Sequence, residues 1–168
     1  GRAALALSVI ECVVKGMMPG IGEPVFEKLD ANLAKAVMSI GAVKGVEIGD
    51  GFASAESFGS SNNDAFCLDQ DKHITKATNH AGGILGGISD GSDVILRAAV
   101  KPTPSIAKTQ QTVNRDKEPI AIEIGGRHDP IIVPRAVVVV EAMTAITVFD
   151  MMMESMSSNL DRIKRFFS

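Results

Sequence analysis

The sequence predicts an α+β fold, in which helices pack against antiparallel strands. Residues 5–14 are apolar, rich in β-branched side chains and without a helical period, which is typical of a strand. Residues 24–41 repeat apolar side chains at helical spacing, and residues 111–124 alternate around a polar turn, which predicts a hairpin. The 168 residues, 45% of them hydrophobic, suffice for one domain with its own core, so we expect 1–168 to be a single domain.

The first strand should be covered on both faces, and a loop rich in glycine and proline follows it at 16–24. Pro24 then suits the first turn of a helix. Its apolar stripe, spaced by four, four, four and three, is Val25, Leu29, Leu33, Val37 and Ile40. Gly41 is expected to end this helix in the left-handed position.

The middle of the chain alternates between strands and glycine-rich segments. Residues 42–52 predict a short strand broken by glycines, and the polar, irregular stretch 53–78 predicts a mobile loop, either a lid or a disordered segment. Five glycines in 79–91 expose N–H groups for a phosphate or a ring edge, or else form a tight turn packed under a neighbouring element. Neither GxGxxG nor a Walker loop occurs there.

A strand at 93–100 leads directly into KPTPS at 101–105. Pro102 and Pro104 stiffen this loop, so Lys101, Thr103 and Ser105 should stand at fixed positions, as contact with an oxyanion or a phosphate requires.

The stretch 124–143 combines glycines, charged side chains and prolines before a long helix. Gly125 and Gly126 precede Arg127, His128 and Asp129, a cluster that indicates either a site for an anionic ligand or a solvated turn with a local ion pair. We expect the helix over 134–154, followed by an amphipathic tail at 155–168. Its predicted apolar positions are Val137, Val140, Ala142, Met143 and Ile146.

The composition of the chain argues against several classes of binding partner. A net charge of −3 and the absence of Trp and Tyr argue against nucleic acid. Two cysteines favour a reducing compartment, so we expect a cytoplasmic protein, and the charges within 131–149 argue against a membrane span. A metal site from His73, His80, His128 and Cys67 is improbable at their irregular spacing, so no metal is expected.

Five segments in order resemble the C-terminal half of chorismate synthase: GEPVFEKLDA at 22–31, VKGVEIGDGF at 43–52, TNHAGGILGGISDG at 78–91, KPTPSI at 101–106, and GRHDPIIVPRA…VEAM at 126–143. The resemblance implies a β-α-β sandwich, of which this chain is about one half, in a homotetramer. It also implies anti-1,4-elimination of phosphate from 5-enolpyruvylshikimate 3-phosphate to give chorismate. The family requires reduced FMN, with NADPH as a candidate reductant.

The resemblance also assigns site residues. Asp129 matches a carboxylate that helps relay a proton, with a structural role orienting Arg127 as the alternative. The implied flavin contacts are Gly41, Ala42, Gly86, Lys101, Pro102, Thr103, Pro104, Ser105 and Arg127.

The family's N-terminal segments FGESHG, RPGHAD and GGRSSARE, which carry its active-site histidines and most of its substrate-binding arginines, do not occur here. We therefore expect these 168 residues alone to have low or no activity. The alternative is a non-catalytic module that binds flavin or phosphate.

Overall fold

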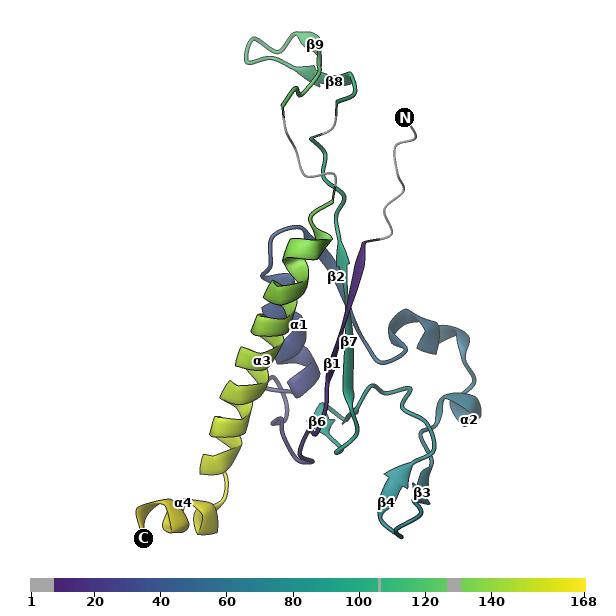
Figure 1. The fold of residues 1–168 in the computed structure, drawn as a ribbon, viewed down its shortest axis with the longest axis vertical. Coiled ribbons are helices and arrows are strands. Elements are labelled where there is room, and N and C mark those ends of the chain that lie inside the picture. Colours follow the sequence, from purple (N-terminus) through teal and green to yellow (C-terminus); the bar gives the residue numbers. More distant parts are fainter. Residues whose placement is uncertain (1–7, 106, 127–130) are drawn as a thin grey trace.

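A computed structural model of the protein describes residues 8–105, 107–126 and 131–168. Its centre is an antiparallel sheet of three strands in the order β1-β7-β2, formed by β1 (Val9–Val14), β7 (Val94–Val100) and β2 (Val43–Ile48). Two helices, α1 (Leu29–Met38) and α3 (Val133–Ser157), pack on one side of this sheet (Figure 1). This arrangement confirms the α+β class.

The core lies between the sheet and the two helices. Side chains alternate along the strands, so one face of β7 and β1 points at the helices. The core residues are Ile10, Val43, Val94, Leu96, Ala98 and Val100 from the sheet, Leu29, Leu33, Val37, Val140, Val148 and Met151 from the helices, and Met17, Ile21 and Ile84 from the segments that connect them. Val9 and Val13 on the other face are 52% and 41% exposed, so the prediction that this strand is covered on both faces was wrong. In the described residues the helices cover one face of the sheet.

Helix α1 begins five residues later than predicted. Residues 24–26 form bends, 27 and 28 are not helical, and Val25 and Phe26 are exposed. The helix starts at Leu29 because the N–H of Leu29 donates to the carbonyl of Gly87 at 2.8 Å, which ties the first turn to the glycine-rich segment. After the helix ends, the left-handed residue is Ala42, with φ of 70°, and not Gly41 as predicted.

The stretch 53–78 has regular structure, so the prediction of an irregular loop was wrong. It contains part of a 3-10 helix η1 (Gly51–Glu56), a short helix α2 (Gly59–Asn62), and a hairpin of β3 (Phe66–Leu68) and β4 (Ile74–Lys76). Two polar side chains of this stretch, Lys76 and Thr78, donate to the carboxylate of Asp64. Mobility of this stretch stays a prediction.

The glycine-rich segment forms the hairpin of β5 (Ile84–Leu85) and β6 (Ile88–Ser89) at the start of β7. Several of its glycines allow two backbone segments to approach closely. A Cβ on Gly82 would lie 2.6 Å from Cα of Gly49, and a Cβ on Gly83 would lie 2.5 Å from the carbonyl oxygen of Asp93. For these glycines the structure favours the packed-turn interpretation over ligand binding.

Two further elements extend from the body. The predicted hairpin is confirmed as β8 (Gln110–Val113) and β9 (Pro119–Ile122), which projects beyond the end of the sheet (Figure 1). After α3, the tail contains helix α4 (Leu160–Phe167).

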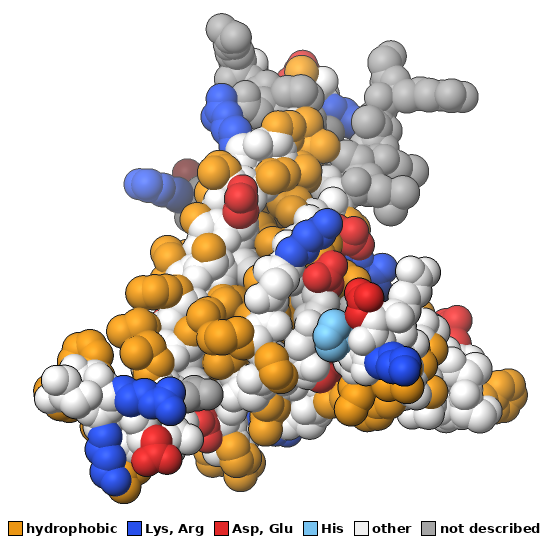
Figure 2. All heavy atoms as spheres, turned by 60° about the horizontal axis from the view of Figure 1, so that its bottom comes forward, with side chains coloured by type: hydrophobic (Ala, Val, Ile, Leu, Met, Phe, Trp, Pro, Cys, Tyr) orange, Lys and Arg blue, Asp and Glu red, His pale blue; other side chains and the backbone are white. Residues whose placement is uncertain are grey.

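The predicted long helix is confirmed as α3, although its buried face differs from the expected one. The buried residues are Val140, Thr144, Val148, Met151 and Ser155, whereas Val137 and Ile146 are 46% and 62% exposed. Exposed apolar side chains run along α3 in Figure 2. By length and composition α3 could cross a membrane, but a single helix of this kind is weak support for a span.

Candidate functional site

A pocket of about 360 Å³ lies where the turn after α1 meets the end of β7. The N–H of Lys101 donates to the carbonyl of Ala42 at 2.7 Å, and this bond joins the two segments. The lining residues are Ala42, Lys44, Lys101, Pro102, Thr103, Pro104 and Ile132.

The walls of this pocket are apolar, and its polar groups are cationic or neutral. Lys44 and Lys101 carry the positive charges. The hydroxyl oxygen of Thr103 is buried and has no hydrogen-bond partner among the described residues. A buried polar atom without a partner is unfavourable, so a ligand that bonds to it would gain affinity. Apolar walls with two lysines and a hydroxyl suit a ligand with a flat, largely apolar ring that has polar edges and an anionic group.

Backbone strain also lies at this pocket. Ala42 adopts φ of 70°, a left-handed conformation that costs an alanine about 1 kcal/mol or more. Its carbonyl is held by Lys101, so the neighbouring strand end maintains the conformation. Strained residues that persist in this way concentrate at functional sites.

Comparison with known proteins identifies the family. The sequence profile of chorismate synthase matches residues 7–153. The chain belongs to the chorismate synthase family. The chorismate synthase of Lachnospira eligens is 63% identical over 159 residues, which are 95% of this chain and 43% of that protein. The one from Archaeoglobus fulgidus is 61% identical over 146 residues, 86% of this chain and 40% of that protein.

A solved structure described as "Crystal Structure of Chorismate Synthase" matches with a TM-score of 0.68 at 31% identity, covering 95% of this chain and 40% of that one. The chain thus spans less than half the length of the chorismate synthases it matches. The described residues accordingly form a three-stranded sheet with one helical layer and three two-stranded hairpins, part of the family fold.

The structure brings together five of the residues that the resemblance to chorismate synthase assigns to flavin. These are Ala42, Lys101, Pro102, Thr103 and Pro104, which all line the pocket. Gly41 and Ser105 adjoin this set in the chain but do not line it. Arg127 and Asp129, with His128, lie outside the described residues.

Gly86 does not line this pocket. It belongs to the β5–β6 turn at the start of β7, whereas Lys101 follows the end of β7. The seven residues of β7 separate the two positions by roughly 20 Å at about 3.3 Å per residue. Gly86 has φ of 61° and open space where a side chain would be, so its backbone is accessible.

Sequence reasoning missed Lys44 and Ile132. Lys44 follows inward-facing Val43, so alternation along β2 directs it away from the core. That signal could have identified Lys44, whereas the place of Ile132 depends on how α3 packs.

The two histidines that the structure describes, His73 and His80, each lie beside an aspartate. Nδ1 of His80 lies 2.6 Å from Oδ2 of Asp50, and Nδ1 of His73 lies 3.3 Å from Oδ2 of Asp69. Among the described residues, no group of three or more His, Cys, Asp or Glu side chains could hold a metal ion.

Proposed function

We propose that this chain is the flavin-binding part of a chorismate synthase. In the whole protein, 5-enolpyruvylshikimate 3-phosphate would lose its phosphate and a ring hydrogen by anti-1,4-elimination to form chorismate, with reduced FMN bound. The observation that carries the proposal is the pocket itself. Residues assigned to flavin by resemblance line one apolar cavity with two lysines and a hydroxyl that lacks a partner among the described residues.

Each lining group has a role in this proposal. Pro102, Pro104 and Ile132 exclude water from the ring, and the Thr103 hydroxyl bonds to a polar ring edge. Lys44 and Lys101 attract the FMN phosphate. Bound reduced flavin supplies electron density to the reacting ring and a basic nitrogen for its hydrogen.

The remaining assignments follow from the resemblance. Arg127 would contact a phosphate through its planar guanidinium, and Asp129 would help to relay a proton. NADPH as the reductant of the flavin, a homotetramer and a cytoplasmic location belong to the same proposal.

Titration with two ligands tests the assigned pocket. Lys44→Ala and Lys101→Ala should each weaken binding of reduced FMN by about 3- to 10-fold, while riboflavin, which lacks the phosphate, should bind these variants as it binds the parent. Thr103→Val should weaken both ligands. Lys108→Ala, an exposed lysine outside the pocket, is the matched control. Equal loss of FMN and riboflavin in the lysine variants would contradict the proposed phosphate contact.

Phosphate release separates a chorismate synthase from a non-catalytic module. With substrate and reduced FMN, the isolated chain should release phosphate slowly or not at all. Supplying the unmatched part of the Lachnospira eligens chorismate synthase should restore release. Flavin binding with no release in the reconstituted complex would favour the module.

A further inference from the structure

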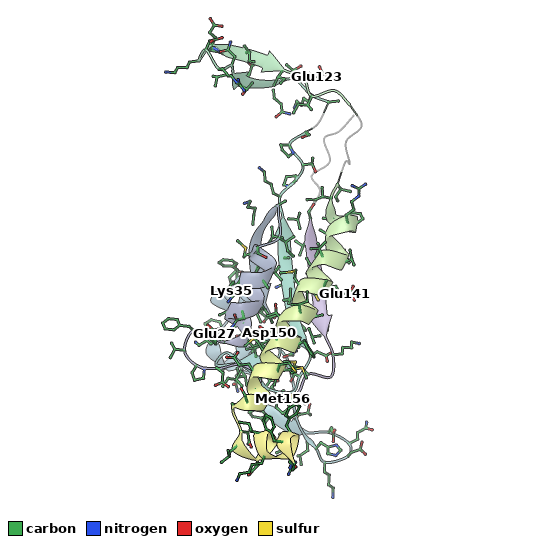
Figure 3. All side chains as sticks on the ribbon, turned by 90° about the vertical axis from the view of Figure 1, so that its left-hand side faces the viewer. Glu27, Lys35, Glu123, Glu141, Asp150 and Met156 are labelled. Carbon is green, nitrogen blue, oxygen red and sulfur yellow. The ribbon has the colours of Figure 1, made fainter. Side chains whose placement is uncertain are left out.

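A second cavity lies on the face of the sheet opposite to α1 and α3. Figure 3 views the sheet from the helix side, with Lys35 on α1 and Glu141 on α3 in front of it, whereas η1 lies on the other side of the sheet in Figure 1. The cavity has a volume of about 220 Å³. Val9, Gly45, Glu47, Phe52, Arg97 and Ala99 line it. It shares no lining residue with the pocket assigned to flavin, so the two cavities are distinct.

Small side chains in the middle of the sheet form the floor of this cavity. In the antiparallel register Val9 pairs with Ala99, and Ala99 pairs with Gly45, so these three residues form a row across β1, β7 and β2, here called the apolar row. A Cβ placed on Gly45 would lie 3.6 Å from Cβ of Ala99, which is an ordinary contact. Phe52 of η1 also lines the cavity and is 82% exposed. This end of the cavity is therefore apolar and open.

The neighbouring row of the sheet carries charges. Arg97 pairs in register with Glu11 on β1 and with Glu47 on β2. Residues two apart on a strand point to the same face, so this row lies beside Ala99. Nη2 of Arg97 lies 3.2 Å from Oε2 of Glu47 and donates to the carbonyl of Gly49 at 3.1 Å. The Nε–H of Arg97 is buried and has no hydrogen-bond partner among the described residues.

These charges favour a ligand that carries both signs. The row holds one positive and two negative charges, a net of −1, so a simple anion would be repelled by two carboxylates. An amine alone would leave the Nε–H of Arg97 without an acceptor, which is unfavourable for a buried donor. A ligand with a carboxylate and an ammonium satisfies all three side chains. The volume lies below the roughly 300–1,000 Å³ of pockets for drug-sized ligands, which limits the ligand to a small molecule.

We propose that this cavity binds a free α-amino acid with an apolar side chain. A rotation of the Arg97 guanidinium brings Nε and a terminal nitrogen to the cavity, where both donate to the ligand carboxylate. The ligand ammonium donates to the carboxylates of Glu11 and Glu47. The ligand side chain packs on the apolar row, and Phe52 closes over it. The proposal is independent of the flavin proposal.

Calorimetric titration of the chain tests the ligand class. At least one of L-leucine and L-phenylalanine should bind about tenfold more tightly than L-serine, because its apolar side chain is removed from water. The amide of the tighter amino acid lacks the carboxylate, and its N-acetyl derivative lacks the ammonium. Each derivative should bind roughly tenfold or more weakly than the parent amino acid. Equal affinity for either derivative, or no binding of either amino acid at about 10 mM, would overturn the proposal.

Two substitutions place the ligand in this cavity. Arg97→Met should weaken the amino acid about tenfold or more, whereas Arg115→Met, at an exposed arginine outside the cavity, should change affinity less than about twofold. Gly45→Val fills the cavity from β2 and should have a similar effect, with Ala121→Val in β9 as its control. If Arg97→Met does not fold because it loses the ion pair with Glu47, Gly45→Val still decides. Unchanged affinity in Gly45→Val would refute the assigned cavity.

A substitution that removes the charge of Glu47 should have opposite effects on two ligands. Oε1 of Glu47 accepts from the N–H of Phe52 at 3.1 Å, and Glu47→Gln keeps an oxygen for this bond. The variant should bind the amino acid about threefold more weakly, because the ammonium loses a partner. It should bind the N-acetyl derivative more tightly, because one repelling carboxylate is gone. Weaker binding of both ligands, or parent affinity for both, would contradict the ammonium contact.

Discussion

Asp64 anchors the segment between β2 and β7 through a buried carboxylate. It accepts hydrogen bonds from the N–H groups of His80 at 2.8 Å and Ala81 at 2.9 Å, and from the Thr78 hydroxyl at 2.7 Å. Its side chain and that of Lys76 are each 3% exposed, and Lys76 also binds Asp90 at 2.7 Å. Burial raises the pKa of Asp64, but these hydrogen bonds and the Lys76 charge outweigh it and lower the pKa from 3.8 to about 2.

The lowered pKa predicts an acid-sensitive contribution to stability. Above about pH 5 the carboxylate is ionised in both states, and the contribution of about 2 kcal/mol is fully present. It is lost progressively as the pH falls below 3.8 and through about 2. Asp64→Asn should therefore lower the free energy of unfolding at pH 7 by about 2 kcal/mol or more. Urea unfolding between pH 2 and 6 should show a weaker pH dependence in Asp64→Asn, with the remainder from Asp90, whose pKa is also lowered. The exposed Asp116→Asn should behave as the parent, and an equal change there would contradict the assignment.

At the scale of elements, the end of β2 approaches the glycine-rich segment so closely that only glycine fits. Gly49 has φ of 58°, and its N–H donates to the carbonyl of Ile95 at 2.9 Å. A Cβ there would overlap the backbone of His80 and lie 2.5 Å from the N atom of Gly82. This contact sets the position of η1 relative to the sheet.

A matched pair of alanine substitutions tests that contact. Gly16 also has positive φ, 69°, but nothing lies within 4 Å of the point that a Cβ on it would occupy. Gly16→Ala should therefore cost about 1 kcal/mol from backbone conformation alone, and Gly49→Ala a further 1–3 kcal/mol or so from overlap. Urea unfolding measures both. Similar losses in the two variants would show that the backbones can separate cheaply.

The elements that the sequence predicts well are those with local signals. The apolar spacing of residues 29–37, the apolar run of 94–100 and the polar turn of 114–118 each determine an element through neighbouring residues. The wrong predictions concern segments whose structure depends on contacts with residues far away in the sequence. The start of α1 depends on a carbonyl at Gly87, and the order of 53–78 depends on Asp64 and its partners.

The same distinction applies to the site. Pro102 and Pro104 mark a stiff loop in the sequence, and this loop lines the pocket. The separation of Gly86 from that loop depends on the direction of β7 and the place of the β5–β6 turn, which no local pattern encodes. Lys44 and Ile132 reach the pocket from two further elements, so the complete lining requires the tertiary structure.

At the scale of the whole molecule, the β8–β9 hairpin and the segment around Asp64 differ in their attachment. The hairpin projects from the body, and every residue of β9 is exposed (Figure 1). The β3–β4 hairpin also has exposed strands, but Lys76 at its end is buried in ion pairs with Asp64 and Asp90. The first hairpin should open alone, whereas opening the second must break a buried network.

Limited trypsin digestion distinguishes these two segments. The first cuts should fall at Lys108, Arg115 or Lys117, in and beside the projecting hairpin, because cleavage there needs little unfolding. Cleavage at Lys72 should be slower, and cleavage at Lys76 should track global unfolding, because its side chain is 3% exposed. Asp64→Asn should accelerate cleavage at Lys72 and Lys76 without changing the early cuts. If 53–78 were a mobile lid, Lys72 and Lys76 would instead be cut first in the parent protein, and Asp64→Asn would change little.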